Sequence, residues 1–103
     1  MGQRYLVVVD MQHDFVDGAL GTPEAQAIVA SVAAKAQAFD GTVVFTKDTH
    51  YSDYLQTLEG KNLPVEHCLH GTPGWELMPE LQAIRDERSS FVFEKTTFAS
   101  LDL

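Results

Sequence analysis

The strongest constraint on the fold is a short apolar run near the N-terminus. Tyr5 to Val9 (YLVVV) is continuously apolar and is followed at once by Asp10. A strand with one face in water alternates apolar and polar residues, whereas a strand buried on both faces stays apolar throughout. The run therefore predicts a strand of a parallel sheet that is covered on both faces.

A helix and a second strand follow at the spacing of a β-α-β unit. Thr22 is suited to cap a helix and Pro23 to occupy its first position. Apolar residues then recur at helical spacing: Ala25, Ile28, Val29, Val32, Ala36 and Phe39. Thr42 to Thr46 (TVVFT) predicts the second strand, and such a unit is expected to be right-handed.

The second half predicts a long loop, a helix and a third strand. The loop runs from Asp48 to Trp75, and a loop of this length is usually functional. A helix is predicted over 76–85 with Leu77, Leu81 and Ile84 facing inward, then a strand over 91–93; a further helix is expected to begin at Thr97. We therefore expect an α/β fold, a doubly wound Rossmann-like parallel sheet that residues 1–103 build incompletely, with a raw apolar edge, as one part of a single domain.

Composition excludes several classes of partner. The chain holds 15 acidic and 7 basic residues, a net charge of −8, which disfavours nucleic acid and anionic membrane surfaces. The sequence has no apolar run near the roughly 20 residues needed to span a bilayer. Cys68 is the only cysteine, so no disulfide can form within the chain, and a cytoplasmic location is expected.

Charged residues follow each of the three predicted strands. The first strand is followed by Asp10, the second by Lys47 and Asp48, and the third by Glu94 and Lys95. Parallel strands bring their carboxyl ends to one edge of the sheet, which is where α/β proteins bind ligands. These side chains are expected to converge there, although a strand-end aspartate is also a common cap and a lone lysine is commonly solvated.

A set of metal-ligating side chains lies in and beside the long loop. Asp48 and His50 are two residues apart, so on an extended backbone they point to the same side. His67 follows His50 by 17 residues, and Glu59 lies between them. Two imidazoles with two carboxylates would suit Zn²⁺, Mn²⁺ or Fe²⁺.

The remaining aromatic and histidine residues have simpler interpretations. Phe15 either lines a pocket above the sheet edge or anchors a loop, and Trp75 has the same two interpretations, with packing favoured. His13 and His70 are interpreted as polar loop residues.

Taken together, these residues resemble the isochorismatase-like cysteine hydrolases, most closely their nicotinamidase branch. The resemblance covers nearly the whole chain and lies in four segments: VVVDMQHDFVDGALG at 7–21, VVFTKDTH at 43–50, LPVEHCLHGTPGWEL at 63–77 and VFEKTTFASLDL at 92–103. Isochorismatases proper generally lack the metal-ligand set, so Asp48, His50 and His67 favour the metal-dependent amidase branch.

The resemblance implies a role for each matching residue. Asp10 and Lys95 match the family's catalytic aspartate and lysine, and Phe15 matches the aromatic residue beside the substrate ring. Asp48, His50 and His67 match the metal ligands, with Glu59 as the fourth ligand. The implied reaction is deamidation of nicotinamide or a similar small carboxamide, in the context of NAD salvage, by a cysteine thiolate and a divalent metal. A homo-oligomer is compatible with the resemblance.

One element of the family pattern is expected after Leu103, namely the nucleophilic cysteine. Cys68 follows His67, where relatives commonly carry a cysteine that is not the nucleophile. We therefore expect these 103 residues to be the N-terminal portion of a catalytic domain, inactive alone. The alternatives are a non-catalytic truncated relative or metal-binding module, and a ureido or carbamoyl amide hydrolase. A phosphatase-like chain, which usually has a second aspartate two residues after the first, is disfavoured by Gln12.

Overall fold

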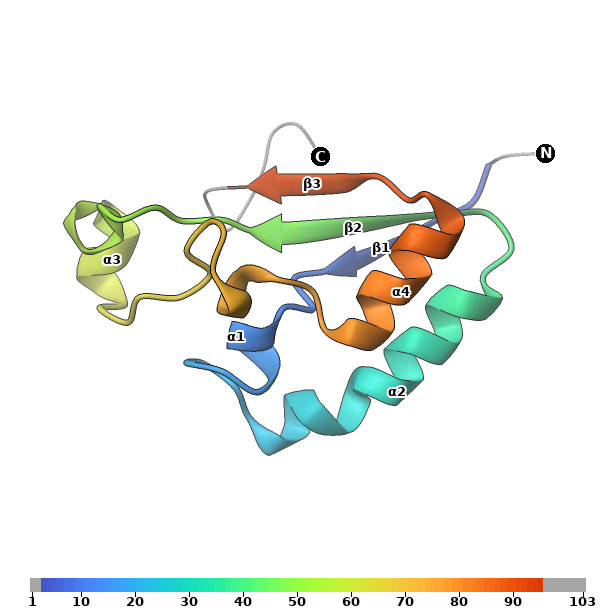
Figure 1. Ribbon diagram of the computed structural model, residues 1–103, viewed down its shortest axis with the longest axis horizontal. Coiled ribbons are helices and arrows are strands. Elements are labelled where there is room, and N and C mark those ends of the chain that lie inside the picture. The colour runs from blue at the N-terminus through green and yellow to red at the C-terminus, as the bar shows by residue number, and fades with distance from the viewer. Residues whose placement is uncertain (1–2, 96–103) are drawn as a thin grey trace.

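The computed structural model describes residues 3–95, which form a three-stranded parallel sheet with helices packed against it (Figure 1). The strands are β1 (Tyr5–Val9), β2 (Thr42–Asp48) and β3 (Val92–Lys95), in that order across the sheet. Val9 pairs with Thr46, and Asp48 pairs with Lys95. The predicted parallel α/β fold is confirmed, with β2 running two residues further than predicted, so that Asp48 belongs to the strand itself.

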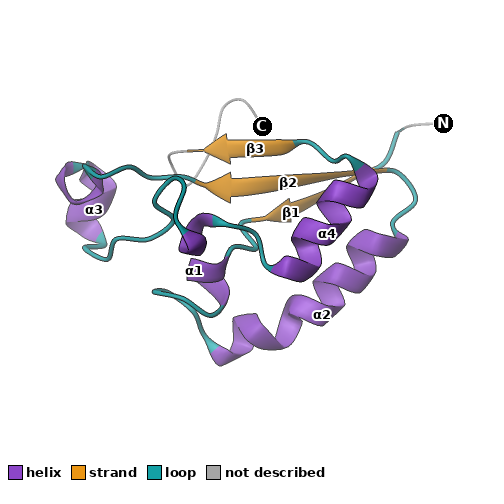
Figure 2. Cartoon of the chain, viewed as in Figure 1, coloured by secondary structure: helices purple, strands orange, loops and turns teal. Residues whose placement is uncertain are grey.

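Two helices cover one face of this sheet, as the helix and strand colouring of Figure 2 makes clear. They are α2 (Pro23–Ala38), which connects β1 to β2, and α4 (Pro79–Arg88), which connects β2 to β3. Their buried apolar residues pack against the sheet in one core with Val8, Val43 and Phe45: Val29, Ala36, Leu81 and Ile84. No helix within residues 3–95 is long and apolar enough to cross a membrane.

Both helices differ from their predicted form in one respect. Helix α4 begins at Pro79 instead of residue 76, because proline suits the first helical position and disfavours helical backbone in the residue before it. Met78 accordingly has non-helical torsion angles, with a ψ of 143°. In α2, Thr22 accepts a hydrogen bond from the N–H of Ala25 as predicted, but Ile28 is half exposed instead of facing the core.

The opposite face of the sheet is not covered by the described residues. Tyr5 is 59% exposed and Phe91 63% exposed, and Val7 and Val9 are also exposed. Tyr5, Val7 and Phe91, together with Val44 and Phe93, line an apolar hollow of about 410 Å³. The prediction that β1 is buried on both faces is therefore wrong for this part of the chain, because α2 and α4 both pack on the same face.

The predicted long loop contains short helical turns. They are η1 (Tyr54–Gln56), α3 (Leu58–Asn62) and η2 (Pro73–Trp75), and a fourth short helix, α1 (His13–Val16), follows β1. An isolated bridge joins His50 to Leu69 and another joins Gln12 to Leu77, which holds the segment against the end of the sheet. The helix expected from Thr97 lies outside the described residues.

Arg88 provides a test of how the connection between α2 and β2 is stabilised. Its guanidinium donates hydrogen bonds to four carbonyl oxygens in the last turn of α2 and in the residues just after it, those of Ala36, Gln37, Phe39 and Gly41. Helix C-terminal carbonyls have no partner within their own helix. We expect Arg88→Met to lower the free energy of unfolding by about 2 kcal/mol, measured by urea denaturation. Lys35→Met, at an exposed position on α2, should change it by less than about 0.5 kcal/mol, and equal stability of the two variants would contradict the role of Arg88.

Candidate functional site

The carboxylate of Asp10 is held by two side chains, one from β2 and one from β3. Lys95 Nζ lies 2.7 Å from Asp10 Oδ2, and the Thr46 hydroxyl donates to Asp10 Oδ1 at 2.6 Å. Lys95 and Thr46 are buried, and the side chain of Asp10 is 20% exposed. Asp10 and Lys95 therefore form a fixed ion pair across the central strand, called the acid–base pair below.

The backbone of Asp10 is left-handed, with a φ of 53°. This conformation costs a non-glycine residue roughly 1–2 kcal/mol, although aspartate tolerates it better than most residues. It ends β1 at Val9 and turns the chain away from the direction of the strand. Strained torsion angles of this kind cluster at functional sites.

Three buried side chains place potential metal ligands close together beside this pair. One ligand atom from each of Asp48, His50 and His67 lies within 4.8 Å of the other two. Asp48 Oδ2 is 2.9 Å from His50 Nε2 and 3.5 Å from His67 Nε2. The structure thus brings together three of the four predicted ligands from the end of β2 and from the long segment that follows.

Glu59 approaches the same cluster from α3. Its Oε2 atom lies 3.2 Å from His50 Nε2, and Thr57 caps the helix by accepting the N–H of Gly60 at 3.0 Å. Glu59 contacts His50 but is not one of the three residues whose ligand atoms all lie within 4.8 Å of one another. Its place as a fourth ligand stays a prediction.

The donor set fits a divalent cation. Ligands bound at about 2.0–2.1 Å in a tetrahedron lie about 3.3 Å from one another. Three of the separations here are close to that value: 2.9 Å for Asp48 and His50, 3.2 Å for His50 and Glu59, and 3.5 Å for Asp48 and His67. His67 Nδ1 lies 2.7 Å from the carbonyl oxygen of Val65, so with Nδ1 protonated its Nε2 is free to act as a ligand.

Unpartnered carboxylate oxygens point to the same conclusion. Within residues 3–95, Asp48 Oδ1 and both oxygens of Glu59 are buried without a hydrogen-bond partner. A buried carboxylate oxygen without a hydrogen bond is costly, and a divalent cation would supply the missing partner.

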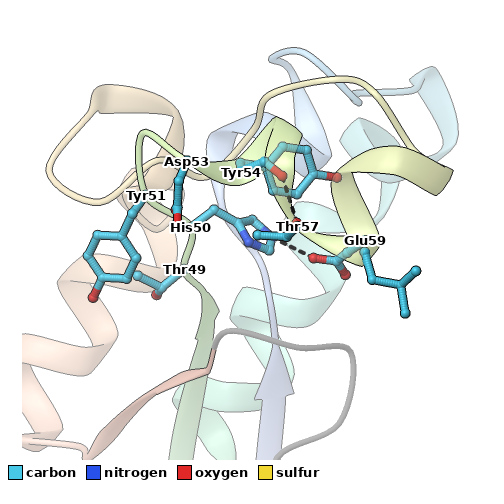
Figure 3. A pocket seen from close by; sticks show the side chains of 8 residues that line it. Thr49, His50, Tyr51, Asp53, Tyr54, Thr57 and Glu59 are labelled. Carbon is cyan, nitrogen blue, oxygen red and sulfur yellow. Dashed lines mark hydrogen bonds and ion pairs between the residues drawn. The ribbon is translucent and has the colours of Figure 1, made fainter.

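A cavity of about 370 Å³ opens beside the cluster. It is lined by Thr49, His50, Tyr51, Asp53, Tyr54, Thr57, Leu58 and Glu59, and Figure 3 shows the His50 ring and the Glu59 carboxylate facing each other within it. Burial, and secondarily the carboxylates of Glu59 and Asp48, raise the pKa of Tyr54. Its hydroxyl therefore stays protonated and donates to the carbonyl of Leu63 at 2.8 Å.

The aromatic residues singled out in the sequence occupy different places. The half-buried Phe15 ring meets the edge of His67 at a centroid distance of 5.4 Å, beside the cluster and not in this cavity. Its contact with substrate stays a prediction. Trp75 packs as expected, since its indole N–H donates to Thr49 Oγ1 at 2.9 Å and its ring lies 3.6 Å from Lys47 Nζ.

His13 and His70 lie apart from the three-residue cluster. His13, in α1, pairs with Asp17, and His70 contacts the rings of Tyr51 and Trp75. Neither residue is one of the three clustered metal-ligand candidates.

The comparison with protein families decides the classification. The isochorismatase domain family matches residues 4–102. The chain belongs to the isochorismatase family.

Solved structures similar to this isochorismatase-family chain include several amidases. Nicotinamidase PncA from Bacillus subtilis is 30% identical with a TM-score of 0.81, over 99% of this chain and 62% of that one. N-carbamoylsarcosine amidase from Thermoplasma acidophilum is 33% identical with a TM-score of 0.77, over 92% and 53%. Pyrazinamidase of Pyrococcus horikoshii in complex with zinc is 29% identical with a TM-score of 0.69, over 96% and 55%. The chain thus spans between about half and two thirds of the length of these relatives, and no curated protein sequence matches it significantly.

Three residues of this isochorismatase-family site were not predicted to contribute. Thr46 binds Asp10, Gln12 binds the backbone of Asp48, and Asp14 Oδ2 accepts the N–H of Cys68 at 2.7 Å. Asp10, Gln12 and Asp14 alternate directly after β1, which is the one sequence signal that could have indicated a shared role. A threonine within a strand is common, so Thr46 carries no comparable signal.

Cys68 lacks the properties of a nucleophile. Its side chain is fully buried, and its backbone is left-handed with a φ of 51°. Burial, together with the carboxylates of Asp48, Asp14 and Asp10, raises the pKa of the Cys68 thiol far above its ordinary value, against a smaller opposing effect of Lys95. Reactive cysteines instead have lowered pKa values and partial exposure. This geometry agrees with the expectation that Cys68 is not the nucleophile.

The reactivity of Cys68 can be measured directly. The thiolate is the species that reacts with iodoacetamide, so a raised thiol pKa leaves less of it at any pH below that pKa. At about pH 8.5, the ordinary thiol pKa, we expect alkylation of Cys68 in the folded protein to be at least about tenfold slower than in guanidinium chloride. Peptide mass spectrometry would follow the modified residue, and equal rates in both conditions would contradict this assignment.

Proposed function

We propose that this chain supplies the acid–base pair and the metal ligands of a metal-dependent cysteine amidohydrolase that deamidates nicotinamide or a similar small carboxamide. One observation carries the proposal: Lys95 joins the two groups. Its Nζ atom lies 2.7 Å from Asp10 Oδ2 and 4.0 Å from Asp48 Oδ1. An acid–base pair therefore borders a cluster of metal-ligand candidates at the edge where α/β sheets bind ligands.

Asp10 would move the protons of the reaction. Its carboxylate would take the proton of a cysteine thiol as the thiolate attacks the carboxamide carbon, and would then protonate the leaving amine. The resulting thioester would react with water to give the acid and restore the thiol, so ammonia is the only other product. Thr46 and Lys95 would hold the carboxylate in one orientation through these steps.

Lys95 would act by charge. The ammonium group is buried and points at the site, so it would stabilise a thiolate placed near Asp10 and lower the pKa of that thiol. The nucleophilic cysteine itself is proposed to lie in polypeptide outside these 103 residues, because Cys68 is buried and its thiol pKa is raised.

The proposed metal ligands are Asp48, His50 and His67, with Glu59 as the fourth. Their two imidazoles and two carboxylates suit Zn²⁺, Mn²⁺ or Fe²⁺, and the similar pyrazinamidase of Pyrococcus horikoshii is a complex with zinc. When bound, the cation would supply a positive charge that orients the substrate and polarises its polar atoms. Phe15, beside His67, is proposed to flank the ring of the substrate.

A second candidate is hydrolysis of a carbamoyl amide. It is supported by the 33% identity to N-carbamoylsarcosine amidase from Thermoplasma acidophilum, slightly above the 30% identity to nicotinamidase PncA. Both candidates use the same acid–base pair, so the substrate tells them apart.

The activity can be tested with the full-length protein loaded with Zn²⁺, Mn²⁺ or Fe²⁺. We expect ammonia release from nicotinamide, and the carbamoyl candidate predicts it from N-carbamoylsarcosine. Asp10→Asn should lower kcat/KM by about 10²- to 10⁴-fold, since the amide cannot accept the thiol proton. The matched control is Asp40→Asn, an exposed aspartate before β2 that undergoes the same change of charge.

Three outcomes have distinct meanings. Release from N-carbamoylsarcosine alone would favour the second candidate. No ammonia from either substrate would overturn the amidohydrolase proposal, and full activity of Asp10→Asn would remove Asp10 from the mechanism.

Metal binding is tested separately from activity. His50→Ala removes the imidazole that approaches both Asp48 and Glu59, so we expect Zn²⁺ affinity to fall by more than about 100-fold, measured by competition with a chelating dye. His70→Ala, which removes an exposed imidazole outside the cluster, should leave the affinity unchanged. Wild-type Zn²⁺ affinity in His50→Ala would refute the proposed ligand set.

A further inference from the structure

Gln12 is fully buried and binds only backbone atoms. Its Oε1 atom accepts the N–H of Asp48 at 2.9 Å, and its Nε2 atom donates to the carbonyl of Asp48 at 2.9 Å. The same Nε2 donates to the carbonyl of Trp75 at 2.7 Å. A side-chain amide thus pairs with one residue of β2 through both a donor and an acceptor.

This pairing replaces the part of the sheet that β1 does not reach. Val9 is paired with Thr46, so a longer β1 would bring its backbone alongside Asp48 two residues further on. The left-handed turn at Asp10 prevents that continuation. Thr49 donates its N–H to the carbonyl oxygen of Lys95 at 2.6 Å on the β3 side, whereas the N–H and carbonyl of Asp48 are both bound by Gln12.

The residue held in this way is central to the proposed metal centre. The Asp48 carboxylate lies 2.9 Å from His50 and 3.5 Å from His67. A fixed backbone at Asp48 limits the directions that its short side chain can take. The bond from Gln12 to Trp75 also ties β2 to the end of the segment that carries His67.

We propose that Gln12 is a positioning residue for the metal centre, whose amide takes the place of a peptide group of β1 and thereby aims the Asp48 carboxylate at the cation. This inference rests on the proposed metal site. It predicts that a change at Gln12 weakens metal binding although Gln12 itself supplies no ligand. A role in stability alone would predict unfolding at lower denaturant with an unchanged metal affinity.

The experiment compares Gln12→Met with a variant of similar expected stability loss in the full-length protein. Methionine has about the length of glutamine but cannot pair with the backbone of Asp48. Arg88→Met loses hydrogen bonds at the opposite end of the sheet, near the start of β2 (Figure 1). Zn²⁺ affinity and the visible absorption spectrum of bound Co²⁺ are measured for both, under conditions where urea titration shows both to be folded.

We expect Gln12→Met to bind Zn²⁺ about 10- to 100-fold more weakly and to alter the Co²⁺ spectrum, as loss of outer partners of metal ligands typically does. Arg88→Met should match wild type in both measurements. If Gln12→Met does not fold, Gln12→Asn is measured in its place. It keeps the amide on a side chain one methylene shorter, and it should show a smaller loss in the same direction.

The outcomes separate this inference from the proposal beneath it. Wild-type affinity and spectrum in the folded Gln12 variant would overturn the positioning role and leave the metal site standing. An equal loss of affinity in Arg88→Met would also overturn it, because the effect would then follow stability. A wild-type protein that binds neither Zn²⁺ nor Co²⁺ would overturn the metal site and this inference together.

Discussion

Parallel pairing of the strands in one register is the constraint on which the rest of the structure depends. It places the ends of β1, β2 and β3 along one edge, so that residues distant in the chain become neighbours. Because β2 lies between them, β1 and β3 are about 9.6 Å apart. The long side chain of Lys95 spans this distance over the central strand to reach Asp10. An antiparallel β3 would carry Lys95 to the other end of the sheet and leave Asp10 without its partner.

Burial determines how these charged groups interact with one another and with nearby titratable groups. Lys95 lies between Asp10 and Asp48, so its ammonium group pairs with Asp10 and also borders the proposed metal ligands. Asp48 and Glu59 keep buried carboxylate oxygens without hydrogen-bond partners in the described part of the chain. The same surroundings have the opposite effect on Cys68, whose thiol pKa rises because burial and nearby carboxylates oppose a further negative charge. One electrostatic environment therefore favours a bound cation and disfavours a thiolate at Cys68.

The five residues after β1 organise this edge. Asp10 binds Lys95 and Thr46, Gln12 binds the backbone of Asp48 and Trp75, and Asp14 binds the N–H of Cys68 beside His67. Each polar side chain thus contacts a different segment, and together they hold the ends of the strands and the long segment in place. The left-handed backbone of Asp10 makes this possible, because it ends the strand and frees the residues that follow to point into the site.

The sequence by itself determined the β-α-β pattern, the charged ends of the strands and the residue types of the candidate site. Apolar periodicity and local turn chemistry are short-range signals, and they sufficed to indicate the α/β class and, with the family resemblance, to name Asp10, Asp48, His50, His67 and Lys95. Only the tertiary structure decided which of these groups touch, because the bonds that matter join residues far apart, 85 positions for Lys95 with Asp10 and 36 for Gln12 with Asp48. It also decided that residues 3–95 leave the second face of the sheet uncovered. An apolar strand indicates that both of its faces can be buried, but it does not specify which segments will cover them.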